Sequence, residues 1–342
     1  MTFLSFLHRV AERVNLTAAE AEQAMSLILS GDATTAQIAA FLVAMRMKKE
    51  TPAELLGLAR ALRARMTRVD AGPGTVIDTC GTGGDSAGTF NVSTVVALVV
   101  AGAGVRVAKH GNRSISSRCG SADVFEGLGV RIDLPPDAAG RSIRETGIGF
   151  LFAPAFHPAM KHAQPARVEL KMRTVFNLLG PLANPAGATA QLVGAPSVEA
   201  AELMAEALAS LGLERGFVVH GSDGLDEITT TGPTTVLEIT RGAIAHRTVE
   251  PADFGIALAR AEDLKGGDRD ENCRIARAIL GGETGPRRDV VLVNASAALV
   301  AAGRAGSFEQ GVALAAESID SRAARTRLEE LVRFSQSAAS DR

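Results

Sequence analysis

The chain has 342 residues, enough to bury a large core in one domain or in two. Apolar residues make up 46% of it and charged residues 22%, both near the averages of globular proteins. The formal net charge of −2 provides no basic field for attracting nucleic acid, so composition argues against a DNA- or RNA-binding protein.

The first seventy residues have the pattern of a series of short helices. Thr17 and Glu20 have the spacing of a capping box, which predicts the start of one helix. Thr35 is expected to cap the next helix, and Thr51-Pro52-Ala53-Glu54 to open another. We predict four helices that form a helical domain over residues 1–70.

From residue 72 onward, short β-rich runs alternate with glycine-rich turns and alanine-rich helices, which is typical of α/β domains. Six strands are predicted, at Val76–Asp78, Val105–Ala108, Gly149–Phe152, Gln191–Gly194, Phe217–His220 and Thr235–Ile239. Helices are predicted at Thr94–Ala103, Ser121–Leu128 and Val198–Ser210. The fold class is therefore α/β, with a mostly parallel sheet covered by helices.

The pattern becomes helical again between Pro165 and Leu179. We expect residues 165–180 to rejoin the N-terminal helices. The catalytic domain would then consist of residues 72–164 and 181–342, with a discontinuous boundary.

Cysteine usage and apolar runs indicate the compartment. The three cysteines are odd in number and widely spaced, which fits neither a disulfide framework nor a C-x-x-C metal site. His8 and Arg9 come too early for the apolar core of a signal peptide. The longest apolar run, Val95–Val105, has about half of the ~20 residues that cross a membrane. We expect a cytoplasmic protein with no membrane partner, and a buried helix at this run.

The segment richest in potential chemistry directly follows the first predicted strand. Gly81–Asp85 contains three glycines, which allow backbone amides to approach a ligand closely. Asn91, Ser93 and Thr94 stand at a predicted helix start, where free amides attract phosphate. The whole string favours a polyphosphate cradle over an ordinary strand-to-helix turn. It lacks the endings of a P-loop and the spacing of a dinucleotide motif, so neither ATP nor NAD is indicated.

A second segment, Lys109–Ser117, follows the next predicted strand. It combines the cations of Lys109 and Arg113 with several hydroxyl and amide donors. Such a loop suits phosphate and pyrophosphate groups that must be held while negative charge grows on a leaving group. A solvated basic turn is the alternative.

A third segment, Asp223–Glu227, lies just beyond a predicted strand, where the active sites of open α/β sheets gather. Asp226 and Glu227, joined by phosphate oxygens and waters, would complete the octahedral shell that Mg²⁺ prefers. An exposed acidic turn is the commoner meaning of such a pair.

Other catalytic patterns find no support in the sequence. The histidines show no zinc spacing, and no G-x-S-x-G elbow indicates serine-based hydrolysis. Cys80 and Cys119 lie beside the loops described above, and we interpret both as small packing residues rather than nucleophiles.

These motifs resemble those of anthranilate phosphoribosyltransferases, in the same order and spacing over nearly the whole chain. The matching strings are Gly81–Asp85, Thr89–Thr94, Lys109–Ser117, Gly120–Asp123, Arg173–Pro185, Asp223–Glu227 and Asn294–Leu299. Lys171-Met172 departs from the family, in which Gly-Ile is more familiar before the arginine. The resemblance implies a nucleoside phosphorylase-like α/β domain, and a homodimer formed through the helical domains.

The resemblance also implies roles for individual residues. Phosphoribosyl pyrophosphate (PRPP) would be bound by Gly81, Gly84, Asp85, Thr89, Asn91, Ser93, Thr94, Lys109, His110, Gly111, Asn112, Arg113, Ser114, Ile115, Ser116, Ser117 and Ser121. Two Mg²⁺ ions would be held by Ser93, Asp226 and Glu227. Anthranilate would be contacted by Gly81, Asn112 and Arg167. Lys109, Asp226 and Glu227 would be the catalytic residues.

The implied reaction converts anthranilate and PRPP to N-(5-phosphoribosyl)anthranilate and pyrophosphate, in tryptophan biosynthesis. An aromatic amine is already neutral and nucleophilic near pH 7, so the difficulty lies in breaking the C1–O bond, and charge stabilisation of pyrophosphate addresses it. One alternative is a pyrimidine nucleoside phosphorylase, which would not need the acidic pair. Another is a non-enzymatic nucleic-acid-binding relative, which should show a basic groove.

Overall fold

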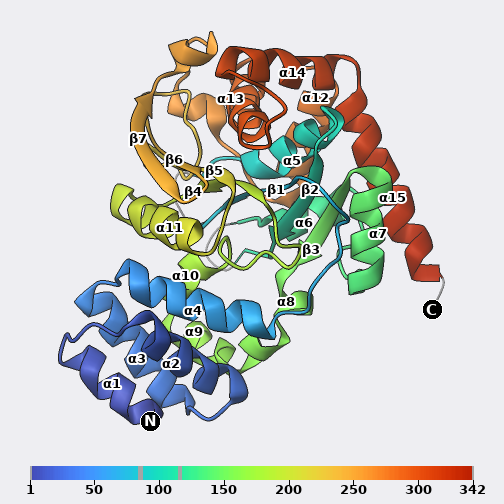
Figure 1. The fold of residues 1–342 in the computed structure, drawn as a ribbon. Helices are drawn as coiled ribbons and strands as arrows, with labels where there is room; N and C mark the ends of the chain where they lie inside the picture. Colours follow the sequence, from blue (N-terminus) through green and yellow to red (C-terminus); the bar gives the residue numbers. More distant parts are fainter. Residues whose placement is uncertain (1, 84–87, 115–117, 341–342) are drawn as a thin grey trace.

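The computed structural model describes residues 2–83, 88–114 and 118–340. In this part of the chain, four N-terminal helices form one end of the molecule, and a seven-stranded sheet covered by helices forms the rest (Figure 1). The helices at the first end are α1 (Phe3–Ala11), α2 (Ala18–Ser30), α3 (Thr35–Lys48) and α4 (Pro52–Arg65). The predicted fold class, with its four N-terminal helices, is confirmed.

Capping boxes define where the short helices begin. At α2, the amide of Glu20 donates to the Thr17 hydroxyl (3.3 Å), and the Glu20 carboxylate accepts from the Thr17 amide (2.9 Å). The prediction that Thr35 caps α3 is wrong, because Thr34 is the N-cap and forms the same reciprocal pair with Gln37. A glutamine at the third helical position can return the bond to Thr34, whereas an isoleucine occupies that position relative to Thr35.

The sheet contains all six predicted strands and one more. The strands are β1 (Val76–Gly81), β2 (Arg106–Gly111), β3 (Ile148–Phe152), β4 (Ala190–Gly194), β5 (Arg215–Gly221), β6 (Thr234–Thr240) and β7 (Ala243–Val249). Their order is β3-β2-β1-β4-β5-β6-β7, with β1 to β5 parallel and the last two antiparallel. β7 was not predicted, because it is an edge strand with mostly exposed side chains and lacks a continuous apolar run.

Helices cover both faces of the sheet. They are α5 (Val92–Gly102), α6 (Ser121–Gly127), α7 (Pro136–Thr146), α11 (Val198–Ser210), α12 (Arg269–Leu280), α13 (Pro286–Ala301), α14 (Phe308–Asp320) and α15 (Ala323–Ser340). Successive strand residues point to opposite faces. Leu192, Phe217 and Val219 therefore share a core with α5 and α13, while Val193 and Val218 share a core with α11 and the N-terminal helices.

The apolar run from Val95 to Val105 forms most of α5 and the turn after it. The side chains of α5 are nearly all buried, because the helix packs between β1 and β2 on one side and α13 to α15 on the other. The expectation of a buried helix is confirmed. Within the described residues, no helix combines the length and apolar character needed to cross a membrane.

The chain returns to the N-terminal helices after β3. The connecting elements are α8 (Ala153–Phe156), η1 (Pro158–His162), α9 (Gln164–Leu170) and α10 (Phe176–Leu179). η1 packs against α2, and α9 packs against α3, so segments far apart in sequence lie side by side at this end (Figure 1).

A buried carboxylate holds the N-terminal helices together. Glu54, at the start of α4, accepts hydrogen bonds from the amides of Leu16 (2.8 Å) and Thr51 (2.9 Å). It also forms an ion pair with Lys48 at the end of α3 (2.8 Å), and both side chains are almost fully buried. The segment before α2, the end of α3 and the start of α4 meet at this carboxylate. Its removal would leave the buried ammonium of Lys48 without its ion-pair partner.

We predict that Glu54→Ala lowers the free energy of unfolding by about 3–5 kcal/mol, the usual cost of leaving one member of a buried ion pair alone. Glu20→Ala is the matched control, since Glu20 also closes a capping box and pairs with an arginine, but in a more exposed position. The control should lose about 1 kcal/mol. Denaturant unfolding of both variants measures the difference, and equal losses would contradict this account of Glu54.

Candidate functional site

Four neighbouring parallel strands end in glycine at the same edge of the sheet. β1 ends at Gly81, β2 at Gly111, β4 at Gly194 and β5 at Gly221. β2 lies on one side of β1 and β4 lies on its other side, so the strand order reverses between β1 and β4. Ligands of open α/β sheets bind outside the carboxyl ends of the strands, at the point where the strand order reverses. We therefore expect the ligand-binding site at the carboxyl ends of β1 and β4.

Asp226 occupies this point. Its carboxylate accepts a hydrogen bond from the amide of Gly83 in the glycine-rich turn (2.8 Å). A Cβ atom at Gly81 would overlap that carboxylate, and one at Gly194 would overlap the backbone oxygen of Asp226. Glycine at both strand ends thus lets the acidic turn approach the sheet closely.

Glu227 lies beside the start of α5. Its carboxylate accepts a hydrogen bond from the amide of Ser93 (3.1 Å), in the first turn of the helix. Asp226 and Glu227 are 8% and 7% exposed, so they do not form the exposed acidic turn considered as an alternative. The fold brings the acidic pair and the glycine-rich segment together from distant parts of the sequence.

Asn294 fixes the backbone that follows the acidic pair. This residue lies on α13 and is fully buried. Its side-chain amide donates to the oxygen of Ile228 (2.8 Å) and its side-chain oxygen accepts from the amide of Ile228 (2.9 Å), as a neighbouring strand would. Sequence reasoning noted the string around Asn294 only as a resemblance, and a lone asparagine in an apolar helix was the available signal.

Lys109 reaches from β2 across to β1. Its ammonium donates to the backbone oxygen of Thr79 (2.5 Å) and to the hydroxyl of Ser93 (3.3 Å). The residue is 2% exposed, so Lys109 does not lie on a solvated basic turn. Lys109 and Glu227 therefore meet at Ser93, and the adjacent Asp226 binds the glycine-rich turn.

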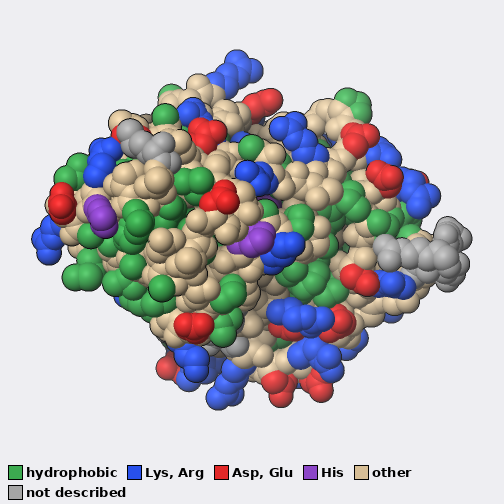
Figure 2. Space-filling view, turned by 90° about the horizontal axis from the view of Figure 1, so that it is seen from below, with side chains coloured by type: hydrophobic (Ala, Val, Ile, Leu, Met, Phe, Trp, Pro, Cys, Tyr) green, Lys and Arg blue, Asp and Glu red, His purple; other side chains and the backbone are tan. Residues whose placement is uncertain are grey.

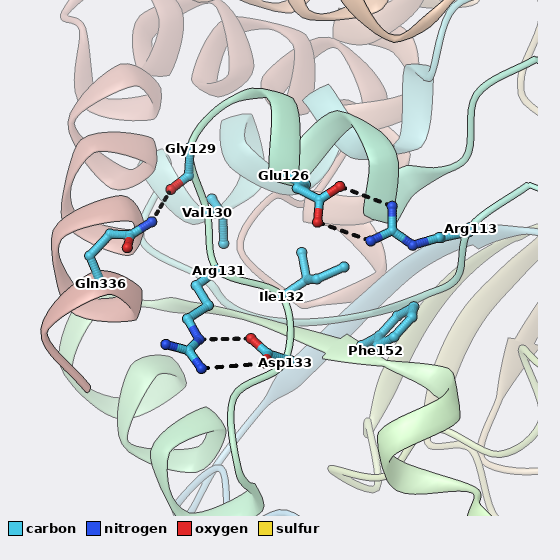
Figure 3. A pocket seen from close by; sticks show the side chains of 9 residues that line it. All are labelled: Arg113, Glu126, Gly129, Val130, Arg131, Ile132, Asp133, Phe152 and Gln336. Atoms are coloured by element: carbon cyan, nitrogen blue, oxygen red, sulfur yellow. Dashed lines mark hydrogen bonds and ion pairs between the residues drawn. The ribbon is translucent and has the colours of Figure 1, made fainter. Parts of the chain in front are cut away.

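Arg113 is held differently from Lys109. Its guanidinium donates to the carboxylate of Asp123 on α6 (2.8 Å). It also donates to Glu126 on the same helix (2.9 Å) and lies 5.9 Å from the ring centre of Phe152 (Figure 3). Asp123 also accepts from the amides of Ser114 (3.4 Å) and Gly120 (2.9 Å). In this structure two carboxylates already neutralise Arg113, and the pair with Asp123 anchors the loop to α6.

The pocket drawn in Figure 3 has a volume of about 410 Å³ and lies at the β3 edge of the sheet. Its charged groups are paired with one another, since Arg131 binds Asp133 (2.8 Å) and Arg113 binds Glu126. A smaller cavity of about 290 Å³ lies between the end of α3 and the glycine-rich turn. The smaller cavity adjoins the polar cluster described above, so we regard it as part of the site.

Arg173 links the helical end of the molecule to the glycine-rich turn along this smaller cavity. Arg46 on α3 donates to the backbone oxygen of Arg173 (2.6 Å), and the guanidinium of Arg173 donates to the oxygen of Gly83 (2.6 Å). Sequence reasoning included Arg173 only in a matching string. The return of residues 165–180 to the N-terminal helices was expected, but the contacts of Arg173 with Arg46 and Gly83 were not.

Two buried histidines stand side by side between the sheet and the returning segment. The ring centres of His110 and His157 are 5.1 Å apart. Burial lowers the pKa of His110 to about 3 and that of His157 to about 4. Both rings are therefore neutral near pH 7, and His110 directs Nδ1 at the oxygen of Gly180 (3.2 Å).

The remaining predicted site residues have the following positions. The amide of Asn91 donates to Asn272 (2.9 Å), and Thr89 forms an isolated bridge with Lys265. The oxygen of Asn112 accepts a long bond from the Ser121 hydroxyl (3.5 Å). The buried hydroxyl of Thr94 has no hydrogen-bond partner among the described residues. Gly84, Asp85, Ile115, Ser116 and Ser117 lie outside the described residues.

The two cysteines beside the loops are poor nucleophiles. Burial raises the pKa of Cys80 well above its ordinary value, and raises that of Cys119 to about 12. Both thiols therefore stay protonated near neutral pH. This supports their interpretation as packing residues.

Arg167 lies on α9, in the returning segment. Its guanidinium is 5.9 Å from the ring centre of Phe176, and burial lowers its pKa. Among the described residues, no carboxylate forms an ion pair with Arg167.

Comparison with known proteins identifies the family. A model described as "Glycosyl transferase family, helical bundle domain" matches residues 4–66, and one described as "Glycosyl transferase family, a/b domain" matches residues 73–325. The chain is 62% identical to an anthranilate phosphoribosyltransferase from Solibacter usitatus, over 98% of this chain and 100% of the relative. The chain belongs to the anthranilate phosphoribosyltransferase family.

Solved structures of anthranilate phosphoribosyltransferases have the same fold. The enzyme from Thermus thermophilus has a TM-score of 0.92 and 44% identity, covering 97% of this chain and 99% of that one. The enzyme from Saccharomyces cerevisiae in complex with PRPP and Mg has a TM-score of 0.90 and 29% identity, covering 98% of both chains. The reaction is accordingly phosphoribosyl transfer to anthranilate, and the alternatives of a nucleoside phosphorylase and a nucleic-acid-binding relative are set aside.

Proposed function

We propose that the edge of the sheet formed by the ends of β1, β2, β4 and β5 is the site where this anthranilate phosphoribosyltransferase breaks the C1–O bond of PRPP. The observation that carries the proposal is the convergence of Lys109, Ser93 and the Asp226–Glu227 pair under the glycine-rich turn. Lys109 lies near the carboxyl end of β2, and Ser93, Asp226 and Glu227 lie in segments that follow β1 and β5. All four are at the end of the parallel strands where ligands of such sheets bind.

The residues that would bind PRPP lie at the carboxyl ends of β1 and β2 and in the segments that follow, as far as the first turns of α5 and α6. Those within the described part of the chain are Gly81, Thr89, Asn91, Ser93, Thr94, Lys109, His110, Gly111, Asn112, Arg113, Ser114 and Ser121. Amides at the start of α5 and the ammonium of Lys109 are suited to phosphate oxygens. The pairing of Arg113 with two carboxylates supports an indirect role for its side chain, through the position of the loop.

Lys109 is the residue best suited to the leaving group. Its ammonium is buried and held by two oxygen atoms, so a third N–H direction remains for a pyrophosphate oxygen. Electrostatic stabilisation is stronger in such a water-poor site than on the surface, and it grows as charge develops on pyrophosphate. No covalent intermediate with the enzyme is required.

The acidic pair fits Mg²⁺, and we propose that two ions act here. Mg²⁺ takes one or two carboxylates and completes its shell with water and substrate phosphates. This donor set agrees with the described residues, which contain no group of three or more histidine, cysteine, aspartate or glutamate side chains placed to hold a metal by themselves. The Saccharomyces cerevisiae relative in complex with PRPP and Mg supports the proposal. Bound Mg²⁺ would neutralise the developing charge of pyrophosphate, with Ser93, Asp226 and Glu227 as ligands.

We predict that Asp226→Asn and Glu227→Gln raise the Mg²⁺ concentration for half-maximal activity by at least tenfold. Removing even an outer partner of a metal site costs roughly 10–100-fold in affinity or activity, and these residues are proposed as direct ligands. A magnesium titration of the coupled reaction measures the shift. Direct Mn²⁺ binding to each variant, detected by electron paramagnetic resonance with PRPP present, provides a second readout. Activity curves that superimpose on the wild type would overturn the ligand assignment.

Arg167 is proposed to bind the anthranilate carboxylate, together with contacts from Gly81 and Asn112. A planar guanidinium suits a carboxylate because it donates two parallel hydrogen bonds. Burial of Arg167 without an acidic partner among the described residues supports this role, since an anionic substrate would supply the missing counter-charge.

We predict that Arg167→Ala raises the KM for anthranilate by roughly 10–150-fold, equivalent to the 1.5–3 kcal/mol of a charged hydrogen bond. The KM for PRPP should change less than twofold, because only the binding of one substrate is removed. The assay follows the loss of anthranilate fluorescence with PRPP and Mg²⁺, with each component omitted in turn. Arg65→Ala, at the exposed end of α4, is the matched control. Equal changes in the KM values of both substrates would contradict the assignment of Arg167 to anthranilate. A wild-type enzyme that does not consume anthranilate would contradict the proposed function.

We also propose that residues 1–70 and 165–180 form one domain, that 72–164 and 181–342 form the other, and that the helical domain makes a homodimer. Large apolar side chains of the helical end are exposed, among them Leu4 (43%), Met47 (69%) and Val168 (53%). Figure 2 views the molecule from this end and shows hydrophobic side chains gathered on the face. Apolar patches of this kind mark interaction surfaces.

Light scattering should therefore give twice the chain mass of 35.4 kDa at micromolar concentration. Met47→Glu should shift the protein toward the monomer, because it places a charge within the apolar face. Leu258→Glu is the control, since Leu258 is 72% exposed but lies far along the chain from the helical domain. A wild-type protein that stays monomeric would rule out the dimer.

A further inference from the structure

β1 and β2 separate before they reach the site. Their register pairs only Val76 with Arg106 and Ile77 with Val107. By contrast, β1 stays paired with β4 up to Gly81, and β2 stays paired with β3 up to Gly111. The sheet is therefore split over the last residues of β1 and β2, directly beneath the loops that carry the proposed PRPP site.

Asp78 fills this split. The residue is fully buried, and its carboxylate accepts from the amide of His110 on β2 (3.2 Å). It also accepts from the side-chain amide of Asn184 (2.8 Å), which donates in addition to the oxygen of Ala108 (2.9 Å). Asp78 and Asn184 thus replace the hydrogen bonds that β1 and β2 no longer exchange.

The side chain of Lys109 crosses the same split in the opposite direction. It starts from β2 and ends at the oxygen of Thr79 on β1, one residue beyond Asp78. Burial raises the pKa of Asp78, and the nearby ammonium of Lys109 opposes that shift. The carboxylate of Asp78 and the ammonium of Lys109 therefore attract each other in the buried interior of the sheet.

We propose that Asp78 is a positioning residue of the transfer reaction, which keeps β1 and β2 apart and holds the backbone around Lys109 so that its ammonium faces pyrophosphate. Without this acceptor, the backbone amide of His110 and the side-chain amide of Asn184 would each lose a hydrogen bond. The ends of β1 and β2 would then move together, because hydrogen bonds between the two strands would satisfy the buried backbone groups. The inference rests on the proposed role of Lys109.

Asparagine at position 78 is an informative replacement, because it keeps the size of the side chain. One of its atoms can still accept from His110, but the other would point an N–H group at the N–H group of Asn184. Lys109→Met is the companion variant, because it removes the ammonium and keeps the length of the side chain. The two variants and their combination form a double-mutant cycle.

In steady-state assays of the whole enzyme, Asp78→Asn should lower kcat/KM for PRPP at least tenfold and change the KM for anthranilate less than twofold. In the Lys109→Met background, Asp78→Asn should cost less than threefold more, because the group it positions is gone. Ser142→Ala is the control for loss of a buried hydrogen bond, since its hydroxyl donates to the oxygen of Ile148 (2.8 Å) at the other end of β3. That control should lower Tm and leave the kinetics within twofold of wild type.

The outcomes are distinguishable. Wild-type kinetics for Lys109→Met would overturn the site assignment itself, and the inference with it. Suppose that Lys109→Met is impaired and that the fold-losses in kcat/KM of the two single variants multiply in the double variant. This result would overturn the inference alone, because the effects of independent residues multiply. If Asp78→Asn does not fold, Asn184→Ala takes its place in the cycle, since it keeps the carboxylate and removes the bridge to Ala108. Full multiplication there would likewise overturn the positioning role.

Discussion

A lysine ammonium can stay buried only where oxygen atoms replace its hydration, and Lys109 meets this condition at the oxygens of Thr79 and Ser93. Much of the architecture around the site follows from this requirement. β1 and β2 must part to let the side chain cross, and Asp78 with Asn184 must satisfy the amides and oxygen exposed by that parting. The cost of burying this charge is met by hydrogen bonds from several segments of the chain.

The same logic explains the glycines at the strand ends. An acidic turn can approach the edge of a parallel sheet only if no side chain intervenes, and a Cβ atom at either Gly81 or Gly194 would overlap Asp226. The close approach allows the amide of Gly83 to bind the carboxylate, while Asn294 holds the backbone of Ile228 from α13. The site is therefore supported from the sheet, from the glycine-rich turn and from the C-terminal helices together.

The helical end is joined to the site by a short chain of contacts. Arg46 on α3 holds the backbone of Arg173, and Arg173 holds the oxygen of Gly83. Arg167 lies on the same returning segment, over the ring of Phe176. An acceptor bound at Arg167 and a donor bound by the strand-end loops would thus be held by two parts of the molecule that meet at the glycine-rich turn.

The sequence by itself determined the six predicted strands, the starts of α2, α4, α6 and α11, and the chemical character of the loops, because alternation, capping pairs and glycine-rich strings act over short distances. It gave no bounds for α7 or for α12 to α15. Local sequence patterns gave the wrong N-cap for α3, where Thr34 and Thr35 are both suitable capping residues. They also missed β7, whose side chains are mostly exposed. Only the tertiary structure decided that Lys109 is buried, that Arg113 turns to α6 and that Asp78 fills the split. These outcomes depend on which residues, distant in sequence, surround each charged group. The spacing of residues within a short segment does not contain that information.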